Sequence, residues 1–179
     1  MPRSLRAAMR ALDESVDAWV DRHRGPRLDP VFYRLSSAAD HSILWNALGA
    51  LRAARTGDPT AGMRFGAVMA IESALTNGPV KAYFRRVRPV EVPGGPMPYG
   101  MHRPRTSAFP SGHATSAFTA ATLLAQDTNA GPFYFAVAAL VASSRVYTRM
   151  HHASDVLAGA ALGLLFGQVA RRLLPMRPK

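Results

Sequence analysis

The chain of 179 residues contains no cysteine, which excludes a disulfide framework and any metal site built from thiolates. Acidic residues are also scarce, because 11 Asp and Glu stand against 22 Lys and Arg and leave a formal net charge of +11. This excess is typical of nucleic-acid binders, of proteins on anionic membranes and of enzymes with anionic substrates. Charge alone does not choose among these three classes.

The sequence also lacks an uninterrupted apolar run of about 20 residues, the usual length of a membrane-crossing helix. Its mean hydropathy is close to zero, but basic connectors dilute five shorter apolar stretches. These stretches cover residues 42–54, 65–80, 114–125, 132–143 and 156–170. They favour an integral-membrane bundle, and a soluble all-helical bundle is the alternative. No compact apolar run with a small-residue cleavage site precedes Pro26, so we expect no cleaved secretory signal.

Helical periodicity predicts an all-α fold in one domain over residues 1–179. Residues 1–30 form an amphipathic N-terminal segment whose helix, 5–23, carries Leu5, Leu12 and Trp19 on one apolar stripe. This helix would lie in the membrane interface or pack on the surface of the domain itself. The bundle, residues 31–175, is expected to contain about five spanning helices. We expect its helices at about 32–55, 63–84, 112–126, 132–147 and 153–174.

Two sequence features qualify this bundle. Residues 89–110 contain six prolines and three glycines, which predicts a long ordered loop at the active site. Gly159, Gly163 and Gly167 recur every four residues in the last helix, so another backbone can approach closely there. That approach is explained by packing inside the bundle or by contact within a homodimer.

Three short motifs carry the chemistry: Lys81 with Arg88-Pro89, Pro110 to His113, and Ser144-Arg145 with His151 and Asp155. Each motif falls at an expected helix end, and in an up-and-down bundle those ends lie on one face. Cations and histidines gathered at helix ends are suited to holding a tetrahedral oxyanion and to transferring a phosphoryl group.

The order and spacing of these motifs resemble the signature of the type 2 phosphatidic acid phosphatase superfamily. That family includes membrane lipid phosphatases, some bacterial acid phosphatases and vanadium haloperoxidases. The resemblance implies that His151 is the nucleophile and forms a phosphohistidine. The four-residue spacing lets Asp155 hold one nitrogen of that imidazole and fix its tautomer. His113 is placed to act as general acid and then as general base.

The remaining predicted site residues bind the phosphate. Lys81, Arg88 and Arg145 supply fixed positive charge to the phosphate oxygens. The Gly112 N–H and the Ser111 hydroxyl open a helix and are expected to point at the same anion. These groups can do the electrostatic work, so we expect no metal and no cofactor.

Other polar residues have weaker interpretations. Glu72 is expected to face the bundle interior as a buried polar contact or to shape the substrate channel. Asn77 could orient Lys81 or bind phosphate. A solvated basic rim that draws in anionic lipid is expected from Arg85, Arg86, Arg103, Arg105 and Arg149. Where family members often have an aromatic residue and a proline, this chain has His152-Ala153-Ser154.

The end of the bundle with the motifs carries 15 of the 22 Lys and Arg, which favours a cytoplasmic active site in a bacterial inner (plasma) membrane. The residues Ala38 to Ser42 with Leu44-Trp45 resemble the compact bacterial members. Among these, phosphatases of decaprenylphosphoryl-5-phosphoribose in cell-wall synthesis are similar in size. We therefore expect a lipid phosphate substrate and the bilayer as partners, and no nucleic acid. Undecaprenyl pyrophosphate and phosphatidylglycerol phosphate are alternative substrates, and a soluble haloperoxidase is the alternative of a different class.

Overall fold

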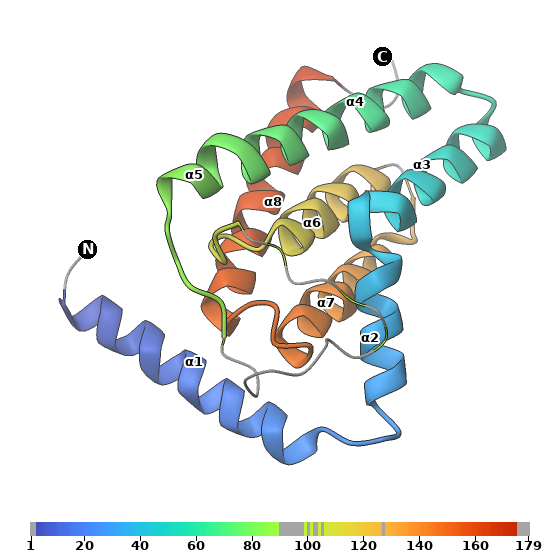
Figure 1. Cartoon of the computed structure of the whole chain (residues 1–179). Helices are drawn as coiled ribbons and strands as arrows, with labels where there is room; N and C mark the ends of the chain where they lie inside the picture. Colours follow the sequence, from blue (N-terminus) through green and yellow to red (C-terminus); the bar gives the residue numbers. More distant parts are fainter. Residues whose placement is uncertain are drawn as a thin grey trace.

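The computed structural model describes residues 3–89, 99, 101, 104, 106–126 and 128–174. These residues form helices and turns without a strand, so the predicted all-α fold is confirmed for them (Figure 1). The helices are α1 (Arg3–His23), α2 (Asp29–Ala38), α3 (Ile43–Thr56), α4 (Pro59–Leu75), α5 (Lys81–Tyr83), α6 (Gly112–Leu124), α7 (Gly131–Tyr147) and α8 (Ala153–Leu173). Most of the predicted loop 89–110 lies outside the described residues.

Helix α6 forms the centre of the bundle, and 11 of its 13 residues are buried. Its buried side chains are mostly Ala and Thr, so neighbouring helices can approach its backbone closely. Figure 1 shows α6 enclosed by α4, α7 and α8. Because α6 begins at the motif of Gly112 and His113, this central position fixes the site within the fold.

The glycines of α8 pack against α6 inside the bundle. A Cβ on Gly159 would lie 2.5 Å from the carbonyl oxygen of Ser111, and one on Gly163 would lie 2.3 Å from that of Thr115. A Cβ on Gly167 would lie 2.5 Å from the Cβ of Thr122. Only hydrogen fits at these places, so packing of α8 on α6 accounts for the glycine spacing without a homodimer.

The helix predicted over 32–55 is wrong, because the chain breaks it in two. Helix α2 ends at Ala38, a 3₁₀ turn covers Asp40–Ser42, and α3 then begins. Ser42 has a φ of 58°, in the left-handed region that side chains other than Gly, Asn and Asp rarely adopt. Neither Gly nor Pro marks the break, so no local signal in the sequence predicts it. The break brings Asp40 to the mouth of the site.

The next helix begins earlier than predicted and does not stay regular. Asp58 caps α4, since its Oδ1 accepts a hydrogen bond of 2.9 Å from the Ala61 N–H. A π-helical turn at Thr76–Val80 follows, in which Gly78 leaves helical geometry (ψ −105°) and Pro79 has no N–H to donate. This widened turn ends at Lys81 and sets the direction of that side chain.

Helix α1 is confirmed, but its acidic side faces the protein. Asp13 is 5% exposed, whereas Trp19 is 54% exposed. Asp17 and Asp21 pair with Arg149, which is itself buried. Among the described apolar residues of this helix, Val20 is the one that is buried in the core, and Leu5, Leu12 and Trp19 are exposed. Long-range ion pairs therefore decide the orientation of this helix, and periodicity alone could not show them.

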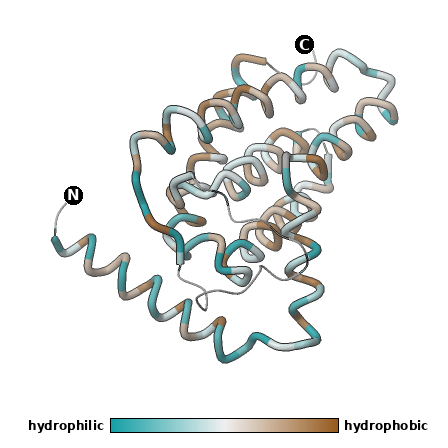
Figure 2. Tube along the Cα trace, viewed as in Figure 1, coloured by the Kyte–Doolittle hydropathy of each residue, from teal (hydrophilic) through white to brown (hydrophobic). Residues whose placement is uncertain are grey.

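Many large apolar side chains point outward from the bundle. Exposed examples lie on α3, α4, α7 and α8: Ile43, Leu51, Met63, Ile71, Phe133, Leu140, Leu157, Leu165 and Leu173. Figure 2 shows apolar residues recurring along α4 and α8, while the connection from α1 to α2 is hydrophilic. By length and composition alone, α8 is the one described helix long and apolar enough to cross a membrane.

Replacing Gly163 by Ala should destabilise the protein by about 1–3 kcal/mol, because the new Cβ would overlap the Thr115 carbonyl. The matched control is Gly66→Ala in α4, where nothing lies within 4 Å of the new Cβ. That change should stabilise the helix by about 0.5–1 kcal/mol. Thermal unfolding of both variants in detergent measures the difference. Equal melting temperatures for the two variants would contradict the close α6–α8 contact.

Candidate active site

The predicted helix ends meet around one cavity of about 460 Å³. Six of the predicted site residues line it: Lys81, Arg88, Gly112, His113, Arg145 and His151. They come from α5 and the segment after it, from the start of α6, from the end of α7 and from the turn before α8. The structure therefore brings together residues up to 70 positions apart, as the motif arrangement predicted. Asp155 and Ser111 lie behind the cavity wall.

His151 lies in the turn between α7 and α8 and is 2% exposed. Its Nδ1 is 2.7 Å from the carbonyl oxygen of Ala108, which can only accept, so Nδ1 carries the proton. The other nitrogen, Nε2, is therefore unprotonated and accepts from Arg88 Nη1 at 3.2 Å. Burial lowers the pKa of His151 to about 3, and the nearby Arg88 and Arg145 act in the same direction. The imidazole is thus neutral and nucleophilic at physiological pH.

Asp155 supports His151 differently from the expectation. Its Oδ2 lies 3.8 Å from His151 Nδ1, beyond hydrogen-bond distance, and accepts from the His152 N–H at 2.9 Å. The Ala108 carbonyl makes the hydrogen bond that was predicted for the carboxylate. Asp155 is fully buried beside the ring, so it stabilises positive charge there by proximity. A backbone partner from a distant segment leaves no sequence signal.

The three cations of the cavity are oriented mainly by neutral acceptors. Lys81 Nζ donates to Asn77 Oδ1 at 2.8 Å, which confirms that Asn77 orients the lysine. Arg88 Nη1 donates to the Met150 carbonyl at 2.7 Å. Arg145 donates to the Ser36 hydroxyl, and its buried Nε has no hydrogen-bond partner among the described residues. An anion in the cavity would meet groups that are already oriented.

Gly112 and Ser111 have different roles at the start of α6, beside the cavity. A Cβ on Gly112 would lie 2.8 Å from Asn77 Oδ1 and 3.4 Å from Lys81 Nζ, so a side chain here would displace the lysine's partner. Ser111 is fully buried, and its hydroxyl oxygen accepts from the Ala114 N–H at 3.4 Å. This hydroxyl caps α6 instead of lining the cavity, because its position as N-cap directs it to the backbone.

A second histidine–carboxylate pair was missed from the sequence. His113 Nε2 is 2.8 Å from Asp40 Oδ1, which also lies 3.9 Å from Arg145 Nη1. Since a carboxylate accepts, Nε2 carries a proton, and the pair can hold the charge of a protonated imidazole. Asp40 stands 73 residues from His113, in the break between α2 and α3 that the sequence did not predict.

The sequence model of the PAP2 superfamily matches residues 61–179, which is more than half of the chain and includes all three motifs. The chain belongs to the PAP2 superfamily. A lipid A 1-phosphatase of Porphyromonas gingivalis is 38% identical over 86 residues, 44% of this chain and 19% of that protein's length.

Two solved structures share the fold. The transmembrane PAP2-type phosphatidylglycerolphosphate phosphatase of Bacillus subtilis superposes with a TM-score of 0.73 at 25% identity. The match covers 96% of this chain and 87% of that one. LpxE of Aquifex aeolicus gives a TM-score of 0.71 at 24% identity, over 88% of this chain and 93% of that one. The likeness covers nearly the whole of each protein.

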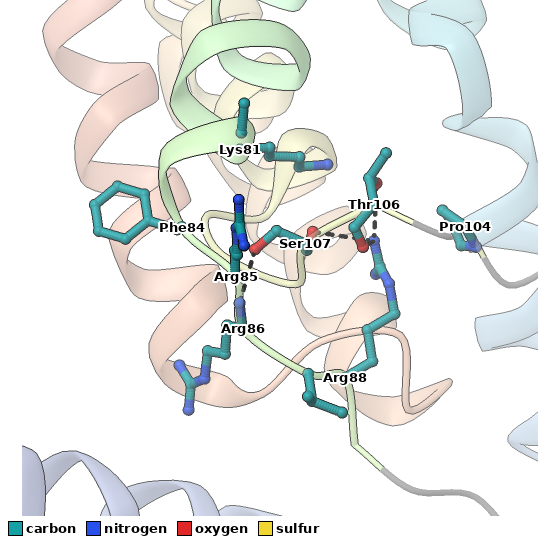
Figure 3. A pocket seen from close by; sticks show the side chains of 10 residues that line it. Lys81, Phe84, Arg85, Arg86, Arg88, Pro104, Thr106 and Ser107 are labelled. Carbon is teal, nitrogen blue, oxygen red and sulfur yellow. Dashed lines mark hydrogen bonds between the residues drawn. The ribbon is translucent and has the colours of Figure 1, made fainter.

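A second cavity, of about 600 Å³, opens beside the first in this PAP2 protein (Figure 3). Lys81, Arg88 and Thr106 line both cavities. The second cavity adds Phe84 and Val87, which are apolar, and Arg85. In Figure 3, Arg88 reaches back to Thr106, and Ser107 bonds the backbone of Arg86. A substrate held in the first cavity can therefore extend along the second.

The predicted basic rim is wrong for two of its arginines. Arg86 pairs with Asp13 and Asp155, and Arg149 pairs with Asp17 and Asp21. Acidic residues of α1 draw both side chains inward. Arg85 is exposed and lines the second cavity, and the remaining two, Arg103 and Arg105, lie outside the described residues.

Glu72 has the buried polar contacts expected of it. It is 1% exposed and accepts from Ser116 at 2.7 Å and from Thr76 at 3.0 Å. It is not among the residues that line the cavity. Within the described part of the chain, no group of three or more metal-binding side chains is found.

Replacing Asp40 by Asn should lower kcat by about tenfold to a hundredfold, the cost of a hydrogen bond to a charged group. The reason is that Asn cannot hold the positive charge of a protonated His113. His113→Ala should lower kcat by about a hundredfold to ten-thousandfold. In that background Asp40→Asn should have little further effect, which steady-state kinetics of the double mutant measures. A lower KM with unchanged kcat in Asp40→Asn would show instead that Asp40 competes with the substrate phosphate.

Proposed function

We propose that the protein hydrolyses a phosphomonoester on a membrane lipid through a phosphohistidine on His151. The observation that carries this proposal is the geometry of His151, with Nδ1–H bonded to Ala108 and Nε2 beside Arg88. An unprotonated Nε2 in a cavity lined by three cations is suited to attack phosphorus. Membership of the PAP2 superfamily and the likeness to PAP2 phosphatases support it.

The reaction follows from these positions in two steps. In the first, Nε2 of His151 bonds to phosphorus as the bond to the lipid oxygen breaks, and the imidazolium of His113, whose Nε2–H is held by Asp40, gives its other ring proton to that oxygen. In the second, His113 takes a proton from water, which attacks phosphorus and releases His151 and inorganic phosphate. Lys81, Arg88 and Arg145 neutralise the phosphate oxygens, and the Gly112 N–H adds the dipole of α6. Asp155 stabilises the positive charge that develops on the His151 ring.

We further propose that α3, α4, α6, α7 and α8 span a bacterial inner membrane with the active site on the cytoplasmic side. The exposed apolar side chains of α3, α4, α7 and α8 support this, because exposing so much apolar surface on several helices to water would be unfavourable. They argue against a soluble haloperoxidase. The excess of Lys and Arg at the site end supports the orientation.

Cysteine labelling tests the topology cleanly, since the chain has no cysteine of its own. Arg27→Cys places a thiol at the site end of the bundle, and Thr128→Cys places one at the opposite end, between α6 and α7. An impermeant maleimide should label Thr128→Cys in intact spheroplasts and Arg27→Cys only after permeabilisation. The reverse pattern would place the site outside. Protection of both thiols until permeabilisation would contradict a spanning bundle.

The proposed substrate is a polyprenyl-linked sugar phosphate such as decaprenylphosphoryl-5-phosphoribose. Besides the cations, the cavity wall presents short polar side chains: Ser37, Ser42, Ser73, Asn77 and Ser116. Such groups can hydrogen-bond the hydroxyls of a sugar that carries the phosphate. Undecaprenyl pyrophosphate and phosphatidylglycerol phosphate are alternatives. The matched P. gingivalis relative adds lipid A 1-phosphate as a further candidate.

A panel of substrates tests this proposal. We expect kcat/KM to be highest for prenyl-linked sugar phosphates and lowest for a water-soluble phosphate ester, because lipid binding positions the phosphorus. His151→Ala should abolish turnover of every member.

Activity should persist in excess chelator, and a loss of activity that Mg2+ or Zn2+ restores would refute a metal-independent reaction. Equal kcat/KM for soluble and lipid substrates would refute the lipid specificity, and a preference for prenyl pyrophosphate would refute the sugar phosphate assignment.

A further inference from the structure

The N-terminal helix reaches the active site through one buried carboxylate. Asp13 is 5% exposed and lies on the face of α1 that packs against α8. Its Oδ1 accepts from the Ser154 N–H at 2.8 Å, and its Oδ2 accepts from the Ser154 hydroxyl at 2.8 Å. A carboxylate from α1 thus binds the first turn of α8, where the positive end of the helix dipole favours it.

Arg86 connects this carboxylate with the one beside the nucleophile. Its Nη2 donates to Asp13 Oδ2 at 2.5 Å, and its Nη1 donates to Asp155 Oδ1 at 2.6 Å. The planar guanidinium can bridge two carboxylates in this way, whereas a lysine can face only one of them closely. Asp155 is fully buried, and a buried carboxylate needs a paired cation to stay ionised.

The contacts form a continuous chain from α1 to the ring of His151. Asp13 holds Arg86, Arg86 holds Oδ1 of Asp155, and Oδ2 of Asp155 lies 3.8 Å from His151 Nδ1. Of these groups only His151 lines the first cavity, while Arg86 lines the second. The superfamily match begins at residue 61, so Asp13 lies outside the part of the chain that the family pattern describes.

We propose that Asp13 and Arg86 are positioning residues for the His151 nucleophile and that α1 therefore contributes to catalysis through Asp13. The proposal rests on the proposed phosphohistidine reaction. Asp13 fixes the guanidinium of Arg86, and Arg86 keeps Asp155 ionised and turned toward the ring. When His151 bonds to phosphorus, its ring gains positive charge, and the fixed carboxylate stabilises that charge. The substrate phosphate does not touch Asp13 or Arg86.

Asp13→Asn tests the proposal in the full-length protein with the best lipid of the substrate panel. Asn keeps the size of the side chain but removes the charge that fixes Arg86. We expect kcat to fall about tenfold to a hundredfold, the range for losing a hydrogen bond between charged groups, with KM unchanged. Rapid acid-free quenching should show that phosphohistidine forms more slowly by a similar factor.

Val20→Ala is the matched control, because it loosens the same face of α1 without changing a charge. Val20 is 4% exposed in the core, and its apolar side chain takes no part in the hydrogen bonds that join Asp13, Arg86 and Asp155. It should lower the melting temperature while kcat stays close to that of the parent protein. Equal losses of kcat in Asp13→Asn and Val20→Ala would overturn the proposal, since α1 would then act only through stability.

Arg86→Lys gives an independent test that does not depend on the recovery of Asp13→Asn. Lysine keeps the charge but bridges only one carboxylate, so kcat should fall with KM unchanged. A parental kcat in Arg86→Lys, or a higher KM at unchanged kcat, would overturn the positioning role. Activity retained in His151→Ala would instead refute the proposed function itself, so the two failures are distinguishable.

Discussion

The contact between α6 and α8 is the constraint on which the site depends. Hydrogen atoms at Gly159 and Gly163 let the α8 backbone meet the carbonyls of Ser111 and Thr115. The Ser111 N–H then donates to the carbonyl of Asp155 at 3.0 Å, so the starts of the two helices are joined directly. His113 lies in the first turn of one helix and His151 just before the other. Their separation is therefore set by backbone packing, which side-chain motion cannot relax.

Most of the regular structure could be predicted from the sequence. Helices α1, α6, α7 and α8 begin and end within about two residues of the expected positions, because their periodicity and their Gly and Pro boundaries agree. The motif residues converge as expected, since each lies at a helix end. The break at Asp40–Ser42 and the π turn at Thr76–Val80 were not predicted. The break carries no Gly or Pro, so local propensity does not report it, whereas Gly78-Pro79 inside the π turn is a local signal that the prediction did not use.

Long-range charge pairing explains the remaining errors. The aspartates of α1 recur every four residues and look like a solvated face, and Arg86 and Arg149 look like a surface rim. Each group is instead the partner of the other, across 73 residues for Asp13 and Arg86 and 132 for Asp17 and Arg149. A single sequence shows that such charges exist but not which of them meet. Asp40 escaped notice for the same reason.

The distribution of acidic partners keeps the cavity positive. Asp155 pairs with Arg86, Glu72 with two hydroxyls, and the aspartates of α1 with arginines behind the wall. Lys81 and Arg88 form hydrogen bonds with amide, carbonyl, hydroxyl and imidazole groups, which orient a cation without cancelling its charge. Asp40 is the one carboxylate at the cavity wall among the described residues, and it lies beside His113, where a proton must be held. Charge for binding the phosphate and charge for holding the proton therefore meet at Arg145, whose Nη1 lies 3.9 Å from Asp40 Oδ1.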